Sequence, residues 1–131
     1  MTERVLVDTN IVSYVLKRDT RVLNYRSHLE NRVLCVSFAS VAELYRWALS
    51  SGWGEARTAQ LRAMLRNYAV LPYDDRLAWE WARAKCVKGF PVSDNDAWIA
   101  ATAVRHDIPL VTHNPGHFLH IPGLQVITEG V

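Results

Sequence analysis

Residues 4–10 read Arg-Val-Leu-Val-Asp-Thr-Asn and combine a strand pattern with a helix-capping pattern. The aliphatic and β-branched run at the start is typical of a strand buried on both faces. Asp8 ends this run, and the segment from Asp8 to Asn10 supplies capping side chains for a helix that begins near Ile11. A buried strand that leads directly into a helix indicates the first unit of an α/β fold.

The rest of the chain repeats this alternation. Short apolar runs predict four more strands, at 33–36, 69–71, 110–112 and 124–127. Apolar spacing, capping residues and glycines predict helices at about 20–30, 40–50, 55–67, 75–87 and 93–106. We therefore expect an α/β fold, a three-layer α/β/α sandwich around a mainly parallel sheet of four to five strands.

The composition is that of a globular protein. The chain has 131 residues, half of them hydrophobic, with only 6 glycines and 5 prolines, which excludes a disordered or low-complexity sequence. This length fits one domain over residues 1–131. No apolar run approaches the ~20 residues of a membrane span. The N-terminus has no signal-peptide pattern, so we expect a cytoplasmic protein in which Cys35 and Cys86 are reduced.

The basic residues are 12 arginines and only 3 lysines. The planar guanidinium group binds phosphate at two points and stacks on bases, so this bias suits a nucleic-acid partner. Genomic base content produces the same bias. Composition alone therefore leaves the nucleic-acid partner open.

Four acidic residues fall where such a fold gathers its functional groups. Asp8 ends the first strand, Glu43 lies in the first turn of the helix after the second strand, and Asp94 and Asp96 start the helix before the fourth. Because strand ends and the helix starts that follow them share one edge of the sheet, these acids can converge. Clustered carboxylates repel one another without a cation, and oxygen ligands suit Mg²⁺ or Mn²⁺. The pattern favours metal-assisted phosphoryl transfer or hydrolysis.

Each acid also has a purely structural interpretation. The segments 40–43 and 93–96 both have capping-box spacing, in which the acid bonds back to the start of its helix. Asp8 could be a turn residue. Asp94 and Asp96 are two positions apart and diverge on a regular helix, so both face one site only if Asp94 stands at the cap.

Five segments in order along nearly the whole chain form a recognisable set. They are Val7-Asp-Thr-Asn10, Val41-Ala-Glu-Leu-Tyr45, Asp96-Ala-Trp-Ile-Ala-Ala-Thr-Ala103, Leu110-Val-Thr-His-Asn114 and Phe118-Leu-His-Ile-Pro-Gly-Leu124. The set resembles the PIN-domain ribonucleases, and within them the VapC-type toxins of toxin–antitoxin pairs. The resemblance implies an endoribonuclease that hydrolyses RNA with Mg²⁺, for which Mn²⁺ would substitute. It also implies a homodimer that is silenced by a cognate antitoxin.

The resemblance assigns roles to individual residues. It makes Asp8, Glu43 and Asp96 the catalytic acids of the metal site, with Asp94 as an additional acid. The polar residues that it places around the acids or the waters of the metal are Asn10, Thr112 and Asn114.

One position departs from the family pattern. An acid often precedes the phenylalanine of the last segment, and here that residue is His117, which leaves the number of metals open. His117 would instead contact phosphate when protonated. The departure also keeps an alternative function open, a degenerate PIN module that binds RNA or protein without cleavage. Retention of the three acids argues against that alternative.

The histidines of the last loop and Trp47 each have competing interpretations. His113, His117 and His120 lack a zinc-site context, because Pro115 and Gly116 interrupt any helix, and we interpret them as surface histidines in a loop. Trp47, one turn beyond Glu43, is either ordinary core packing or a wall of the RNA channel or antitoxin groove.

Overall fold

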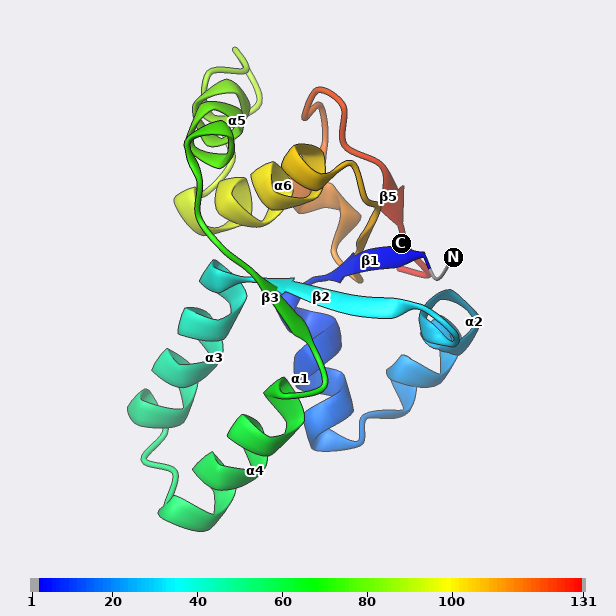
Figure 1. Cartoon of the computed structure of the whole chain (residues 1–131), viewed down its shortest axis with the longest axis vertical. Helices are drawn as coiled ribbons and strands as arrows, with labels where there is room; N and C mark the ends of the chain where they lie inside the picture. The colour runs from blue at the N-terminus through cyan, green and yellow to red at the C-terminus, as the bar shows by residue number, and fades with distance from the viewer. Residues whose placement is uncertain (1–2, 131) are drawn as a thin grey trace.

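A five-stranded parallel sheet forms the centre of the molecule, as seen in a computed structural model that describes residues 3–130 (Figure 1). The strands are β1 Arg4–Val7, β2 Val33–Ser37, β3 Ala69–Leu71, β4 Leu110–Val111 and β5 Val126–Ile127. Their spatial order is β3-β2-β1-β4-β5, and every neighbouring pair is parallel. Helices cover both faces (Figure 1), which confirms the predicted three-layer α/β/α architecture.

The helices follow the predicted order with shifted boundaries. They are α1 Thr9–Lys17, α2 Arg26–Leu29, α3 Phe38–Ser50, α4 Glu55–Leu65, α5 Asp75–Lys85 and α6 Asp94–His106. The helix expected at about 20–30 is instead a 3₁₀ segment, Thr20–Tyr25, followed by the single turn of α2. A second 3₁₀ turn spans Pro115–Phe118. None of the helices described between residues 3 and 130 is long and apolar enough to cross a membrane.

The start of α3 differs from the capping box predicted at residues 40–43. Ser37 is the N-cap, and its hydroxyl accepts a 3.1 Å hydrogen bond from the backbone N–H of Ala39. Ser40 therefore lies inside the first turn, where it is buried and its Oγ accepts a 2.9 Å hydrogen bond from Thr9 Oγ1. Glu43 has no capping role, because the helix began five residues before it.

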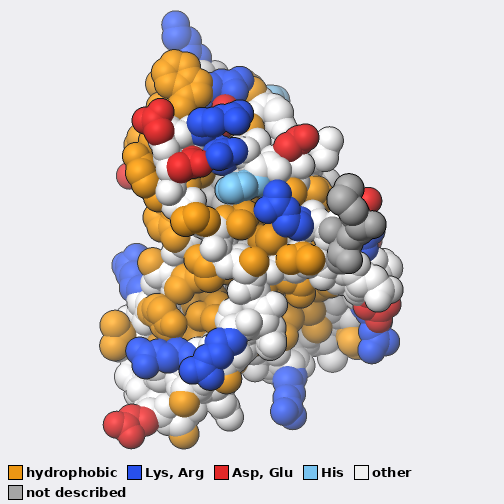
Figure 2. All heavy atoms as spheres, in the orientation of Figure 1, with side chains coloured by type: hydrophobic (Ala, Val, Ile, Leu, Met, Phe, Trp, Pro, Cys, Tyr) orange, Lys and Arg blue, Asp and Glu red, His pale blue; other side chains and the backbone are white. Residues whose placement is uncertain are grey.

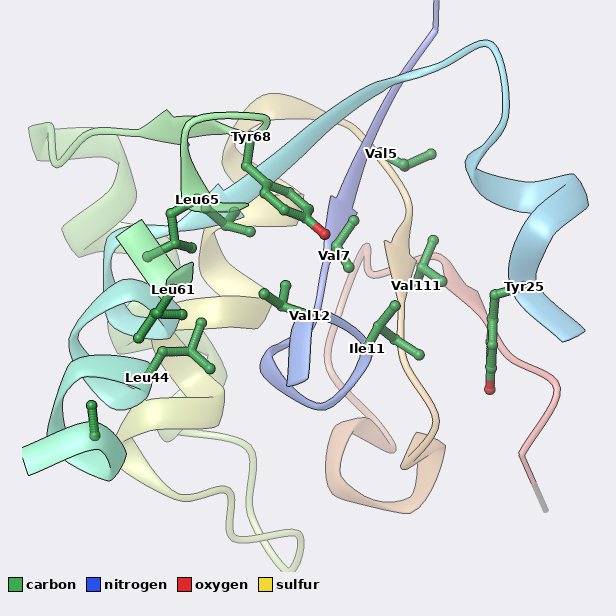
Figure 3. Packing of buried hydrophobic residues seen from close by; sticks show 12 residues of the cluster. Val5, Val7, Ile11, Val12, Tyr25, Leu44, Leu61, Leu65, Tyr68 and Val111 are labelled. Atoms are coloured by element: carbon green, nitrogen blue, oxygen red, sulfur yellow. The ribbon is translucent and has the colours of Figure 1, made fainter. Parts of the chain in front are cut away.

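The apolar core is divided by the sheet, which explains why β1 is hydrophobic at consecutive positions. Val5 and Val7 face the side covered by α1, α3 and α4, where Leu61 packs in the same cluster (Figure 3). Leu6 points to the opposite side and packs with Ile99 of α6. Successive side chains of a strand point to opposite faces, so a strand covered on both sides needs apolar residues throughout.

The register of the sheet brings several strand ends to one edge. Val7 of β1 pairs with Val111 of β4, so the residues that follow them, Asp8 and Thr112, are neighbours. The first turns of α1, α3 and α6 lie at this edge (Figure 1).

In Figure 2, hydrophobic side chains gather across the middle of the visible face, with Lys and Arg groups above and below them.

Candidate active site

A cavity of about 530 Å³ opens at the carboxyl edge of the sheet. Three of the four predicted acids line it: Asp8 from the end of β1, Glu43 from α3 and Asp96 from α6. The other lining residues are Thr9, Asn10, Ser13, Lys17, Leu44, Trp47, Ser93, Asn95, Asn114 and His117. Acids that are 35 and 53 residues apart in the sequence thus share one cavity, as expected where helices begin at the carboxyl edge of a parallel sheet.

Asp8 is the most enclosed of the three acids, with only 6% of its surface exposed. Its Oδ1 accepts a 2.7 Å hydrogen bond from the Thr9 N–H, which caps α1, and its Oδ2 accepts a 2.6 Å bond from Thr112 Oγ1. Burial raises the pKa of Asp8 to about 6, against the opposing effect of these hydrogen bonds. The negative charges of Asp96 and Glu43 raise this pKa further, so the three carboxylates act on one another.

Asp96 is held by the start of α6. Ser93 is the N-cap, and its hydroxyl accepts a 3.1 Å hydrogen bond from the Asp96 N–H, which confirms the predicted cap. Burial raises the pKa of Asp96, the contact with Ser93 and the charge of His117 lower it, and the charge of Glu43 raises it. His117 Nδ1 lies 3.4 Å from Asp96 Oδ2.

Glu43 stands at the opening of the cavity with an exposed side chain. It is three positions beyond Ser40, whose bond to Thr9 joins the first turns of α3 and α1. The charge of Glu43 acts on both Asp8 and Asp96. An exposed carboxylate next to two enclosed ones is accessible both to an ion and to water.

Asp94 does not reach this cavity. Its side chain is 76% exposed, and its Oδ1 lies 2.8 Å from Lys85 Nζ, at the end of α5. Asp94 is the first residue of α6 rather than its cap, so the 100° turn per residue directs it away from Asp96. The convergence expected of four acids therefore involves three.

The predicted polar residues surround Asp8 from two sides. Thr112 is fully buried, and its Oγ1 also accepts a 3.1 Å hydrogen bond from the Asn114 N–H. Asn10 accepts a 3.5 Å bond at Oδ1 from the His113 N–H, which links α1 to the loop after β4. The Nδ2 group of Asn10 is buried and has no partner within residues 3–130.

The three histidines of the last loop have different environments. His117 lies at the cavity beside Asp96, whereas His120 stacks against Phe90. His113 is half-buried, with its Nδ1 at 2.5 Å from the hydroxyl of Tyr25. The interpretation of His113 as a surface histidine is therefore wrong. His113 is turned inward, where it is a hydrogen-bond partner for the hydroxyl of the buried Tyr25.

Two side chains of α1 that none of the sequence motifs contains also line the cavity, Ser13 and Lys17. Their spacing from Asn10, three and seven residues, puts all three on one helix face. This spacing is the sequence signal that could have identified Ser13 and Lys17, which follow the motif at residues 7–10. Asn95, between Asp94 and Asp96, was also not identified.

Carboxylate oxygens like those that line this cavity are the ligands that a hard divalent cation prefers. The charge of Glu43 raises the pKa of both Asp8 and Asp96, and the charge of Asp96 raises the pKa of Asp8, so a positive charge between these carboxylates would stabilise their ionised forms. In the described part of the chain, no three His, Cys, Asp or Glu side chains are arranged to enclose a metal on their own. Mg²⁺ keeps several waters and needs one or two carboxylates directly, so an open acidic cavity suits it.

A protein-family model for the PIN domain matches residues 5–124. The chain is 30% identical to "Ribonuclease VapC1" of Haemophilus influenzae strain R2866 over 125 residues, covering 92% of this chain and 93% of that protein. It is 27% identical to "tRNA(fMet)-specific endonuclease VapC" of Salmonella typhimurium, covering 92% and 94% of the two chains.

Two solved structures have a fold similar to that of this chain. DNA-bound VapBC from Salmonella typhimurium superposes with a TM-score of 0.83 at 26% identity, covering 98% of both chains. VapBC-1 from nontypeable Haemophilus influenzae superposes with a TM-score of 0.80 at 28% identity, covering 95% of this chain and 97% of that one. The similarity includes every element that contributes a side chain to the acidic cavity.

Proposed function

This chain belongs to the PIN-domain family, and from that premise we propose that it is a Mg²⁺-dependent endoribonuclease toxin, neutralised by a cognate antitoxin. The observation that carries the proposal is the convergence of Asp8, Glu43 and Asp96 on one cavity. Three acids from three separate elements are more than helix capping requires. The relatives named as ribonucleases support the same reaction for this chain.

Asp8 and Asp96 would hold the ion, because they are the two partly enclosed carboxylates that line the cavity. Mn²⁺ is expected to substitute for Mg²⁺, since both prefer oxygen ligands. When bound, the ion would polarise the phosphodiester and offset the negative charge that develops in the transition state.

The protein's own residues perform the remaining tasks. Thr112 and Thr9 hold both oxygens of Asp8 before any ligand binds. Glu43, at the exposed mouth, would orient the attacking water and accept its proton. The water oxygen forms the new bond to phosphorus while the bond to the 3′ oxygen breaks, which leaves 5′-phosphate and 3′-hydroxyl ends. His117 would contact a phosphate oxygen when protonated.

Asp96→Asn tests this function directly. We expect the variant to keep its fold and lose cleavage of pooled cellular RNA, because the amide removes the negative charge that the ion requires. Asp107→Asn is the charge-matched control at the other end of α6, where Asn tolerates the left-handed backbone (φ 53°). Asp94→Asn is expected to cleave at the wild-type rate, since Asp94 pairs with Lys85. A full cleavage rate in Asp96→Asn would overturn the assignment.

The degenerate module is tested with the wild-type protein. RNA would be incubated with Mg²⁺, with Mn²⁺ and with EDTA, and the ends of any products sequenced. Cleavage that requires a divalent ion and leaves 5′-phosphates supports the enzyme. RNA binding without cleavage under both metals would support the degenerate module, for which His117 at an often acidic position is the observation in favour.

We also propose that the protein acts in the cytoplasm as a homodimer. The solved relatives described as VapBC are complexes of two proteins, so a small protein from a neighbouring reading frame is the expected antitoxin. Co-expression of the two, followed by light scattering of the toxin alone and of the complex, measures both assemblies. Monomeric toxin at micromolar concentration would contradict the homodimer.

A further inference from the structure

The cavity extends beyond the acids, along α1 and α3. Trp47 lies one helical turn beyond Glu43, and Lys17 is the last residue of α1; both line the cavity. A divalent ion with six waters occupies roughly 200 Å³, counting ~30 Å³ for each water. The cavity holds about 530 Å³. The cavity is therefore larger than the ion needs, and Trp47 lines it.

The indole ring of Trp47 is held in a defined orientation. The Trp53 ring packs against it edge-on, with centroids 4.8 Å apart and planes at 61°. Arg57 in turn covers Trp53, with its guanidinium carbon 4.0 Å from that ring centroid. Trp47 is only half-buried, although Trp53 supports it from the α4 side. A supported and partly open aromatic ring is a stacking platform.

A lysine side chain covers this ring. Lys17 Nζ lies 4.4 Å from the Trp47 centroid, and the Lys17 side chain is exposed. The charge of Lys17 acts on Asp19, but Asp19 is paired with Arg21 at 2.7 Å. The ammonium group can thus exchange its weak contact with the half-buried ring for a stronger one with phosphate.

We propose that Trp47 and Lys17 form a nucleotide subsite beside the acidic cluster. The indole stacks on one base of the RNA, and Lys17 leaves the ring to pair with an adjacent phosphate. A base reaches this ring only when it is unstacked from its neighbours, so the subsite selects single-stranded RNA over duplex RNA. The inference rests on the proposed ribonuclease function, because the acids and the ring share one cavity.

The test measures RNA binding in the Asp96→Asn background, which is expected not to cleave. The probe is single-stranded oligoadenylate of roughly 12 nucleotides, compared with its duplex and with an abasic strand of equal length. Trp47→Leu should raise the Kd for oligoadenylate by about 5- to 150-fold, which is the loss of affinity expected when one base no longer stacks on an aromatic ring. Trp47→Phe should raise it by no more than about 5-fold, since a ring remains. The abasic strand should bind equally well to the parent protein and to the Trp47→Leu variant.

Lys17→Met separates the charge from the ring. It should lower the slope of log Kd against log salt by about 0.7, the value of one phosphate contact on a single strand, whereas Trp47→Leu should leave that slope unchanged. Trp79→Leu is the matched control, because Trp79 is exposed on α5 and lies outside the cavity. It should bind all three probes as the parent does.

The outcomes distinguish this inference from the ribonuclease function. Unchanged oligoadenylate binding in folded Trp47→Leu would overturn the subsite, even if the same variant bound antitoxin more weakly. If Trp47→Leu does not fold, equal affinity of the parent protein for oligoadenylate and the abasic strand would overturn it instead. Trp47-dependent binding by a protein that never cleaves RNA would support the subsite and refute the nuclease.

Discussion

Thr112 Oγ1 donates a 2.6 Å hydrogen bond to Asp8 Oδ2, although the two residues are 104 positions apart. The contact exists because β1 and β4 are adjacent parallel strands, and each residue directly follows the paired valines. The Asp8 N–H also donates a 2.9 Å bond to the Val111 carbonyl, which fixes the backbone at this point. The carboxylate is therefore oriented by the sheet before an ion binds.

Thr112→Val should weaken metal-dependent cleavage while leaving the fold intact. The substitution keeps the side-chain shape but removes the hydroxyl that orients Asp8, and the loss of such a supporting contact typically costs about 10- to 100-fold in metal affinity or activity. Thr112→Ser, which retains the hydroxyl, is the control and should stay near wild type. Cleavage rate as a function of Mg²⁺ concentration measures the effect. An unaltered Mg²⁺ dependence in Thr112→Val would show that Asp8 needs no support.

The layered α/β fold and the acidic edge were predictable because both depend on local patterns. Continuous apolar runs identified the strands, and Asp8 follows the first of these directly. The pairing of β1 with β4 was not predictable in the same way, since residues 110–112 contain no signal of which strand they pair with. The hydrogen bond between Thr112 and Asp8 depends on that pairing, so only the family resemblance suggested it.

Competing local signals limited the prediction of helix starts and of the fourth acid. Ser37 and Ser40 both suit an N-cap, and the choice between them depends on Ser40 being buried against Thr9. Asp94 and Asp96 are the same residue type, and the start of α6 at Asp94 directs their side chains apart, with Asp94 paired to Lys85 of the preceding helix. Both outcomes depend on tertiary contacts, which a local pattern does not contain.

Ser93→Ala should destabilise the protein and reduce activity together. It removes the N-cap of α6, which typically lowers the free energy of unfolding by about 1 kcal/mol. It also loosens the turn that holds Asp96 in the cavity. Ser93→Asn keeps a capping oxygen and should restore most of both properties. Urea denaturation and cleavage rate are measured on the same samples, and a lower stability with full activity would mean that the cap does not position Asp96.

The Asp74–Arg105 pair should make stability depend on pH in the acid range. Hydrogen bonds from the Arg105 guanidinium hold the pKa of Asp74 at about 2, below the ordinary value of 3.8. The folded state thus binds this proton less readily than the unfolded state, so the stabilisation is complete above pH 4 and is lost as the pH falls through 2. Asp74→Asn retains a capping oxygen for α5 without the charge.

The measurement for this pair is the difference in Tm between wild type and Asp74→Asn. Because other acids titrate equally in both proteins, the difference isolates Asp74. It should be constant from pH 7 to pH 5 and shrink toward zero near pH 2. Added salt should reduce the difference at neutral pH, since the pair is partly exposed. A difference that stays constant down to pH 2 would contradict the assigned pKa.

Leu61→Ala should be among the most destabilising substitutions in the helical hairpin formed by α3 and α4. Leu61 is fully buried among the side chains that pack against β1 (Figure 3), so its truncation leaves a cavity and should cost about 2–5 kcal/mol in the free energy of unfolding. Leu49→Ala removes the same atoms from a residue that is 83% exposed, and should change this free energy by less than about 0.5 kcal/mol. Urea unfolding of both variants measures the contrast. Equal losses would mean that α4 does not pack on the sheet as described.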